Sequence, residues 1–165
     1  MLISGEQIGA DIRERLMANV QREQIAIMSD LGSFDAAKIF AEQSLKEVKD
    51  RSLVEQEITY YFWGYQLMRE GLYEEANQYF QKSIDMALKS GDKNRAYDAM
   101  NLYAVSLFFE GKYDKAMQVL SDFVAHFKEQ DPAMIYMLHE MLFDSLHQTL
   151  GTSPEKKPEF ISYVM

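Results

Sequence analysis

The sequence predicts an all-α protein of about seven or eight helices, arranged as a stack of antiparallel helical hairpins. Three observations lead to this prediction. At three places, beginning at Gly32, Gly71 and Gly111, a glycine is followed two residues later by an aromatic residue and three further on by an alanine. The copies are offset by 39 and 40 residues, a period typical of helical-hairpin arrays. No segment shows the apolar–polar alternation of a half-buried strand.

The first hairpin is expected from two helices that meet at Gly32. Isoleucine, leucine and valine recur every fourth residue from Ile8 to Val20, which places them on one face of a helix. Gly32 ends this helix, and Ser33 begins the next one. We assign residues 1–17 to an N-terminal helix and begin the hairpin array at residue 18.

The second hairpin begins at Ser52. A serine followed three residues later by a glutamate, here Glu55, is typical of the capping box at the start of a helix. Its two helices are separated by Gly71. Gly64 lies inside the first of these helices, where a glycine costs about 1 kcal/mol relative to alanine. We therefore predict that a neighbouring helix approaches closely at Gly64.

The third hairpin begins after Gly91, because this glycine can end a helix and Asp92 can cap the next one. Its two helices meet at Gly111. A further helix is expected over residues 133–150, since an aspartate followed by Pro132 is a strong helix start. This helix serves as the first half of a fourth unit or as a cap.

The residues around the second and third turns resemble those of the tetratricopeptide repeat family. The shared pattern is an aromatic or bulky residue, a bulky–small pair, an aliphatic residue, the turn glycine, an aromatic residue, an alanine and a final apolar residue. The two copies are Tyr60, Trp63, Gly64, Leu67, Gly71, Tyr73, Ala76, Phe80 and Met100, Tyr103, Ala104, Leu107, Gly111, Tyr113, Ala116, Leu120. The resemblance implies three hairpins and a capping helix over residues 18–151, followed by a tail over 152–165. A looser likeness connects the chain with the repeat domains of peptide-sensing regulators of Gram-positive bacteria.

Composition and charge narrow the possible functions. The chain carries 26 acidic and 17 basic residues, a net charge of −9, so its surface repels nucleic acid. It has no cysteine, which excludes disulfides, thiol catalysis and cysteine-bound zinc. The first residues lack the basic and apolar segments of a signal peptide, and no apolar run reaches the roughly 18 residues of a membrane span. We expect a cytoplasmic protein that does not enter a membrane.

Nothing in the sequence indicates an enzyme. A phosphate-binding glycine loop, a serine elbow and a dinucleotide fingerprint are all absent. His139 and His147 are eight residues apart, which is about 12 Å along a helix and too far for two ligands of one metal. We therefore expect no catalytic residues, no metal and no cofactor.

The candidate binding surface follows from the family resemblance, which implies that the first helix of each hairpin lines a concave channel. In the second and third hairpins, the helix faces opposite the core are nearly all apolar or aromatic, and monomers rarely leave such a patch without a partner. The candidate residues are Ile58, Tyr61, Phe62, Tyr65, Met68, Arg69, Asn101, Leu102, Val105, Phe108 and Phe109. We expect a protein or peptide partner, and the acidic chain favours a basic one. Arg22 is one possible contributor of a clamp for a partner's carboxylate, but the other residues of such a clamp are missing.

Three alternatives stay open at this point. The channel can be filled by the chain's own N-terminal helix or tail. The chain can also be a homodimeric assembly protein that pairs through the C-terminal tail or through Met134, Met137 and Met141, or a fragment of a larger peptide-responsive regulator.

Overall fold

The computed structural model of the 165-residue chain describes residues 5–116, 118–119 and 122. Its helices are α1 Gly5–Asp30, α2 Phe34–Glu47, the short 3-10 helix η1 Val48–Asp50, α3 Leu53–Arg69, α4 Tyr73–Ser90 and α5 Lys93–Phe109. The described residues include no strand, which confirms the all-α class. These are six helices, fewer than the seven or eight expected for the whole chain, and residues 113–116, 118–119 and 122 beyond them are also helical. The expected helix over 133–150 lies outside the described residues.

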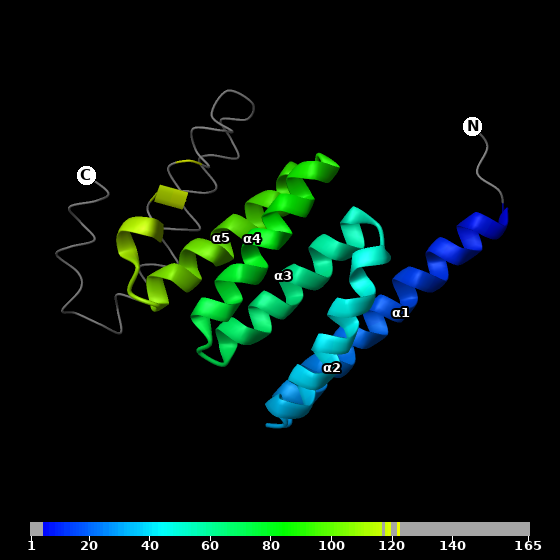
Figure 1. The fold of residues 1–165 in the computed structure, drawn as a ribbon, viewed down its shortest axis with the longest axis horizontal. Coiled ribbons are helices and arrows are strands. Elements are labelled where there is room, and N and C mark those ends of the chain that lie inside the picture. Colours follow the sequence, from blue (N-terminus) through cyan, green and yellow to red (C-terminus); the bar gives the residue numbers. More distant parts are fainter. Residues whose placement is uncertain (1–4, 117, 120–121, 123–165) are drawn as a thin grey trace. The chain divides into compact units, whose positions relative to one another are not determined.

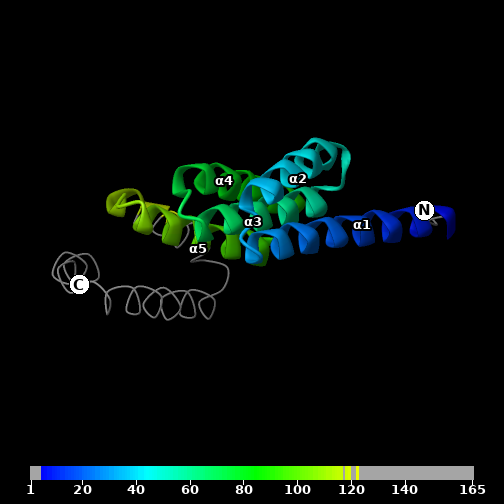
Figure 2. The same ribbon diagram turned by 90° about the horizontal axis from the view of Figure 1, so that it is seen from below.

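The helices form two layers. Figure 2 shows α1, α3 and α5 in one layer and α2 and α4 in the other. Contacts between the two layers hold them together: α2 packs on α1, and α3 and α5 both pack along α4. The N-terminal half of α1 extends past the ends of the other described helices (Figures 1 and 2). Consecutive helices therefore alternate between the layers.

The turns between the helices depend on glycines in the left-handed region. Gly32, Gly71 and Gly111 have φ angles of 76°, 77° and 84°, which glycine adopts without the steric cost that a Cβ would add. At Gly71, for example, the turn is closed because the Leu72 amide donates to the Leu67 carbonyl at 2.9 Å. The prediction that these three glycines end helices is confirmed.

Two predicted helix caps are also present. The Ser52 hydroxyl accepts a hydrogen bond from the backbone amide of Glu55 at 3.3 Å, and the Asp92 carboxylate accepts one from the amide of Arg95 at 3.1 Å. Each cap pairs an amide that the first helical turn leaves without a partner. The starts of α3 and α5 are therefore fixed by local chemistry.

The close approach predicted at Gly64 occurs between α3 and α4. A Cβ at this position would lie 2.9 Å from Cε1 of Phe80 and 3.3 Å from the carbonyl oxygen of Ala76. Phe80 is fully buried, and Leu67 is buried one turn beyond Gly64. The absence of a side chain at Gly64 therefore gives the Phe80 ring its place in the core, which sets how closely α4 packs on α3.

The contacts of the chain divide it into two compact units, residues 1–116 and 117–165. The boundary expected after residue 17 falls inside α1, which continues to Asp30 because no glycine or proline interrupts residues 10–31. The expected tail over 152–165 lies outside the described residues.

Candidate functional site

The candidate surface on α3 is the side that its core contacts leave free. Tyr60, Trp63 and Leu67 are buried, and they direct the opposite side of α3 away from the core. The candidate residues on that side are half-buried at Ile58, Tyr61, Phe62 and Met68, and exposed at Tyr65 and Arg69. Tyr65 is 39% exposed. This helix therefore presents aromatic and aliphatic groups to solvent without a carboxylate among them.

The corresponding side of α5 is more mixed. Asn101, Leu102, Val105 and Phe108 are half-buried, and Phe109 is exposed. We refer to the eleven candidate residues of α3 and α5 together as the α3–α5 surface. Both helices lie in the same layer and pack along the same helix, α4, so their candidate residues come from neighbouring elements.

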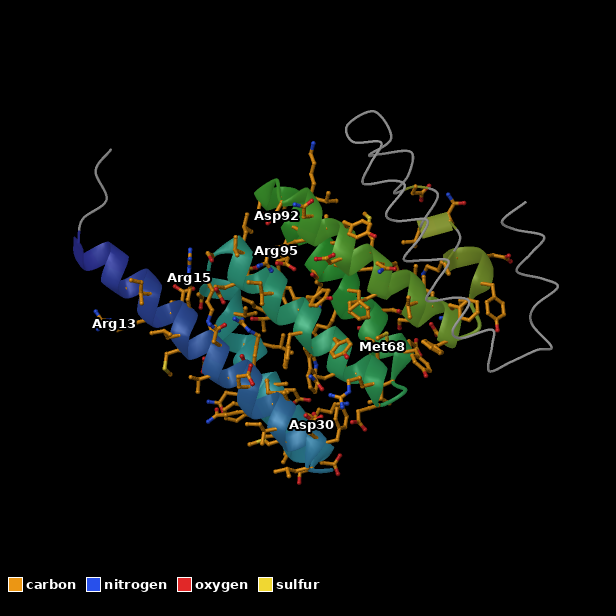
Figure 3. All side chains as sticks on the ribbon, turned by 180° about the vertical axis from the view of Figure 1, so that it is seen from behind. Arg13, Arg15, Asp30, Met68, Asp92 and Arg95 are labelled. Carbon is orange, nitrogen blue, oxygen red and sulfur yellow. The ribbon has the colours of Figure 1, made fainter. Side chains whose placement is uncertain are left out.

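Four of the candidate residues are already engaged within the chain, among them Tyr61, whose ring meets the Phe80 ring edge-on at a centroid distance of 6.4 Å. The Arg69 Nη2 atom lies 2.8 Å from Oδ1 of Asp30, which ties the end of α3 to the end of α1. The Phe109 ring stacks on Tyr73 with a centroid distance of 5.9 Å, and the Phe108 ring meets Tyr113 edge-on at 5.0 Å. The contacts of Arg69, Phe108 and Phe109 lie at the C-terminal ends of α3 and α5. Figure 3 labels Asp30 and Met68 near the end of α3.

The middle of the surface contains a buried polar atom without a partner. The side-chain oxygen of Asn101 is buried and accepts no hydrogen bond from the described part of the chain. A buried acceptor without a donor costs about 1–3 kcal/mol, so such atoms are rare unless water or a ligand satisfies them. The two described neighbours of Asn101 on this side of α5 are Asp98 and Val105, at helical spacing.

Asp98 is an exposed residue of α5 beside the α3–α5 surface, one helical turn before Asn101, and it was not among the residues predicted from the sequence. Burial raises the pKa of its carboxyl group, Arg95 opposes this effect and Asp92 adds to it. Burial likewise raises the pKa of the Tyr61 hydroxyl, and the negative charge of Asp98 raises it further. The charge of Asp98 on α5 therefore influences the ionisation of Tyr61 on α3. Its position three residues before Asn101 was the signal available in the sequence.

Two buried carboxylates set the spacing of the helices in this layer. Glu57 on α3 is only 2% exposed, and it accepts hydrogen bonds from Ser83 of α4 at 3.2 Å and from Nη1 of Arg95 of α5 at 2.9 Å. Glu55 pairs with Nη1 of Arg22 of α1 at 3.2 Å. Each charge is thus paired across helices, as burial of a carboxylate requires.

Arg22 is therefore not available as a carboxylate clamp for a partner. Its guanidinium is buried, and besides Glu55 it donates to Thr59 at 3.4 Å and to Asn19. The sequence placed Arg22 on α1 but gave no indication of which residue of α3 would face it.

The buried Glu57 predicts a pH dependence of stability. Burial raises its pKa above the usual 4.5, and Arg95 and Ser83 oppose this only in part. The folded protein therefore binds this proton more tightly than the unfolded chain. The resulting stabilisation is complete below pH 4.5 and is lost as the pH rises through the folded-state pKa.

A Glu57→Gln variant lacks this titration. Relative to the variant, the wild type should lose free energy of unfolding as the pH rises through the window just above 4.5. Urea unfolding followed by the fluorescence of Trp63, the single tryptophan, measures the difference from about pH 4 to about pH 8. A difference that stays constant, or that favours the wild type as the pH rises, would contradict the assignment.

Two kinds of sequence prediction remain. Some concern residues outside the described part of the chain, and the others concern a metal site and a membrane span. His139, His147, Met134, Met137 and Met141 lie in the undescribed part. The described residues include no group of three or more histidine or acidic side chains placed to hold a metal ion. No helix within the described ranges has the length and apolar character needed to cross a membrane.

Comparison with models of protein families, with curated proteins and with solved structures found no match.

Proposed function

We propose that this chain is a non-enzymatic binding module of the tetratricopeptide type, located in the cytoplasm, which holds a peptide segment of a protein partner against the α3–α5 surface. The observation that carries this proposal is the solvent-facing side of α3, where Ile58, Tyr61 and Tyr65 follow one another at helical spacing with no carboxylate among them. A partly exposed row of apolar and aromatic groups is typical of binding surfaces. The lack of cysteine agrees with a reducing compartment.

The two-layer arrangement supports the family assignment. Helices alternate between the layers, and left-handed glycines stand at matching positions, 39 and 40 residues apart. In such an array the first helices of successive hairpins share one surface, and here these are α3 and α5.

The chemistry of the surface indicates the class of peptide. Tyr65 and Ile58 offer apolar contact area, and tyrosine provides much of it at a small cost in conformational entropy. Asp98 supplies a negative charge next to an aromatic region, a combination that accepts a lysine or arginine side chain. The free acceptor of Asn101 suits a backbone or side-chain N–H of the bound segment. The expected ligand is therefore a peptide that combines apolar residues with a basic one.

Peptide selection tests this proposal. A random peptide library displayed on phage is selected on the full-length chain, and the affinities of synthetic copies are measured by fluorescence anisotropy. We expect apolar sequences with a basic residue, and a Tyr65→Ala variant should bind them about 30-fold more weakly, the effect of losing one dominant contact of about 2 kcal/mol. An Asp98→Asn variant should bind less tightly and with a weaker dependence on salt.

The matched control is Leu88→Ala, which removes an exposed apolar side chain from α4, in the other layer. It should leave peptide affinity unchanged. The proposal fails if the selection enriches no sequence, or if Tyr65→Ala binds the selected peptides as tightly as the wild type.

A further inference from the structure

Helix α1 buries the side that is poorer in apolar groups. Its buried residues from the second turn onward are Ala18, Arg22, Ile25 and Ser29, of which only Ile25 is a large apolar side chain. On the opposite side, five large aliphatic residues are each between 51% and 76% exposed. They are Ile12, Leu16, Val20 and Ile27 of α1 and Leu31, the first residue after its end, and we call them the α1 stripe. In an ordinary amphipathic helix, the aliphatic side faces the core.

The place of the α1 stripe in the layer explains this reversal. Thirty-nine residues after Leu16, Val20 and Ile27 stand Glu55, Thr59 and Gln66 of α3. All three of these α3 residues are buried, and two of them accept hydrogen bonds from Arg22 of α1. In the 39-residue repeat, the α3 residues that face α1 are therefore equivalent to the α1 residues that form the stripe. The stripe lies on the open edge of the layer, where one more helix would continue it.

We infer that the α1 stripe binds the α1 stripe of a second copy of this chain, with the two helices antiparallel. An apolar stripe is self-complementary, and a two-fold axis places the same patch on both subunits. The α1 stripe is not complementary to the side of α3 that contacts α1 within the chain. That side of α3 is polar, and its Glu55 pairs with the guanidinium of Arg22. A copy stacked in the manner of α3 on α1 is therefore a poorer occupant than the stripe itself.

The charges along α1 favour this occupant and its direction. The chain as a whole carries −9, but residues 12–31, over which the stripe runs, hold three acidic and three basic residues, so this segment does not repel its own copy. Within the span of the stripe, the N-terminal half carries Arg13, Glu14 and Arg15, a net charge of +1, and both arginines project from the helix (Figure 3). The C-terminal half carries the exposed Glu23, while Arg22 pairs with Glu55 and Asp30 with Arg69. An antiparallel arrangement brings the arginine-bearing half of each copy toward the carboxylate-bearing half of the other.

The length of the stripe sets the expected strength. From Ile12 to Ile27 it extends for about 23 Å of helix, with Leu31 just beyond, and the pairing of two such helices reaches the lower end of the size range of specific interfaces. A reversible dimer with a dissociation constant on the order of micromolar is therefore expected. The N-terminal half of α1 is accessible to a second copy because it extends past the other described helices.

Sedimentation velocity of the full chain tests the inference. From about 1 to about 100 μM, the wild type should shift from 19.2 kDa toward twice that mass. A Leu16→Glu, Val20→Glu variant should stay at 19.2 kDa throughout and keep its helical circular dichroism, because both side chains face solvent in the single chain. Leu88→Glu on α4, 41% exposed, is the control and should associate like the wild type. A wild type that stays monomeric, or a double variant that associates equally, overturns the inference.

Cysteine cross-linking tests the same contact without relying on the charged variant. The chain has no native cysteine, so single cysteines can be introduced at Ile12 and Ile27, which are 52% and 55% exposed. When the Ile12→Cys and Ile27→Cys chains are mixed and oxidised, the mixed disulfide should exceed both homodisulfides. Mixing Ile12→Cys with Leu88→Cys should give no such excess. Homodisulfides in excess, or equal yields in both mixtures, would overturn the antiparallel contact.

Discussion

Replacing Phe80 by alanine is expected to lower the free energy of unfolding by about 3–5 kcal/mol. Phe80 is fully buried between α3 and α4, where its ring occupies the space beside Gly64 and meets the Tyr61 ring at 6.4 Å. Removing the ring leaves a cavity that a glycine on the facing helix cannot fill. Urea unfolding followed by Trp63 fluorescence and by circular dichroism measures the loss. A cost below about 1 kcal/mol would contradict this packing.

The pairing of Phe80 with Gly64 has its own control. A Gly64→Ala change in the wild type places a methyl group 2.9 Å from the Phe80 ring, and such overpacking costs about 1–3 kcal/mol. In the Phe80→Ala background this clash is absent, so the same substitution should cost much less. Equal costs in the two backgrounds would show that the ring does not lie against Gly64.

Replacing Arg22 by alanine is expected to destabilise the fold by about 3–5 kcal/mol. The ion pair between Arg22 and Glu55 is buried on both sides, with the two side chains 10% and 6% exposed. Without Arg22, the Glu55 carboxylate stays buried and loses its ion-pair partner. An uncompensated buried charge is the reason for the large cost. Urea unfolding monitored by Trp63 again provides the measurement.

Two comparisons isolate the charge of Glu55. In an Arg22→Met, Glu55→Leu double variant neither charge remains, so the cost should be well below that of Arg22→Ala. Lys38 and Glu75 form a partly exposed pair at 3.0 Å, and Lys38→Ala should change stability by no more than about 1 kcal/mol. If the double variant is as unstable as Arg22→Ala, lost packing rather than the unpaired charge causes the effect.

The features predicted correctly from the sequence are those fixed by local chemistry. A turn glycine such as Gly71 and a cap such as Ser52 depend only on residues within one turn of the chain. Gly64 was also informative, because a glycine inside a helix indicates close packing even when its neighbour is unknown. These signals define where each helix begins and ends and where two helices approach closely.

The features missed from the sequence depend on residues far apart in the chain. The four-residue spacing of Ile12, Leu16 and Val20 defined a helix face. Periodicity alone does not tell whether that face points to the core or to solvent. The burial of Arg22 is decided by Glu55, which is 33 residues away. Asp98 likewise gains its role from Tyr61, on another helix. Tertiary pairing of this kind leaves no mark in a single sequence.

NMR chemical-shift mapping with a selected peptide tests most directly whether α3 and α5 together form the peptide-binding surface. The largest shifts of backbone amides and side-chain methyl groups should lie around Ile58, Tyr65, Asn101 and Val105. Shifts centred instead on α2 and α4, in the other layer, would contradict this prediction.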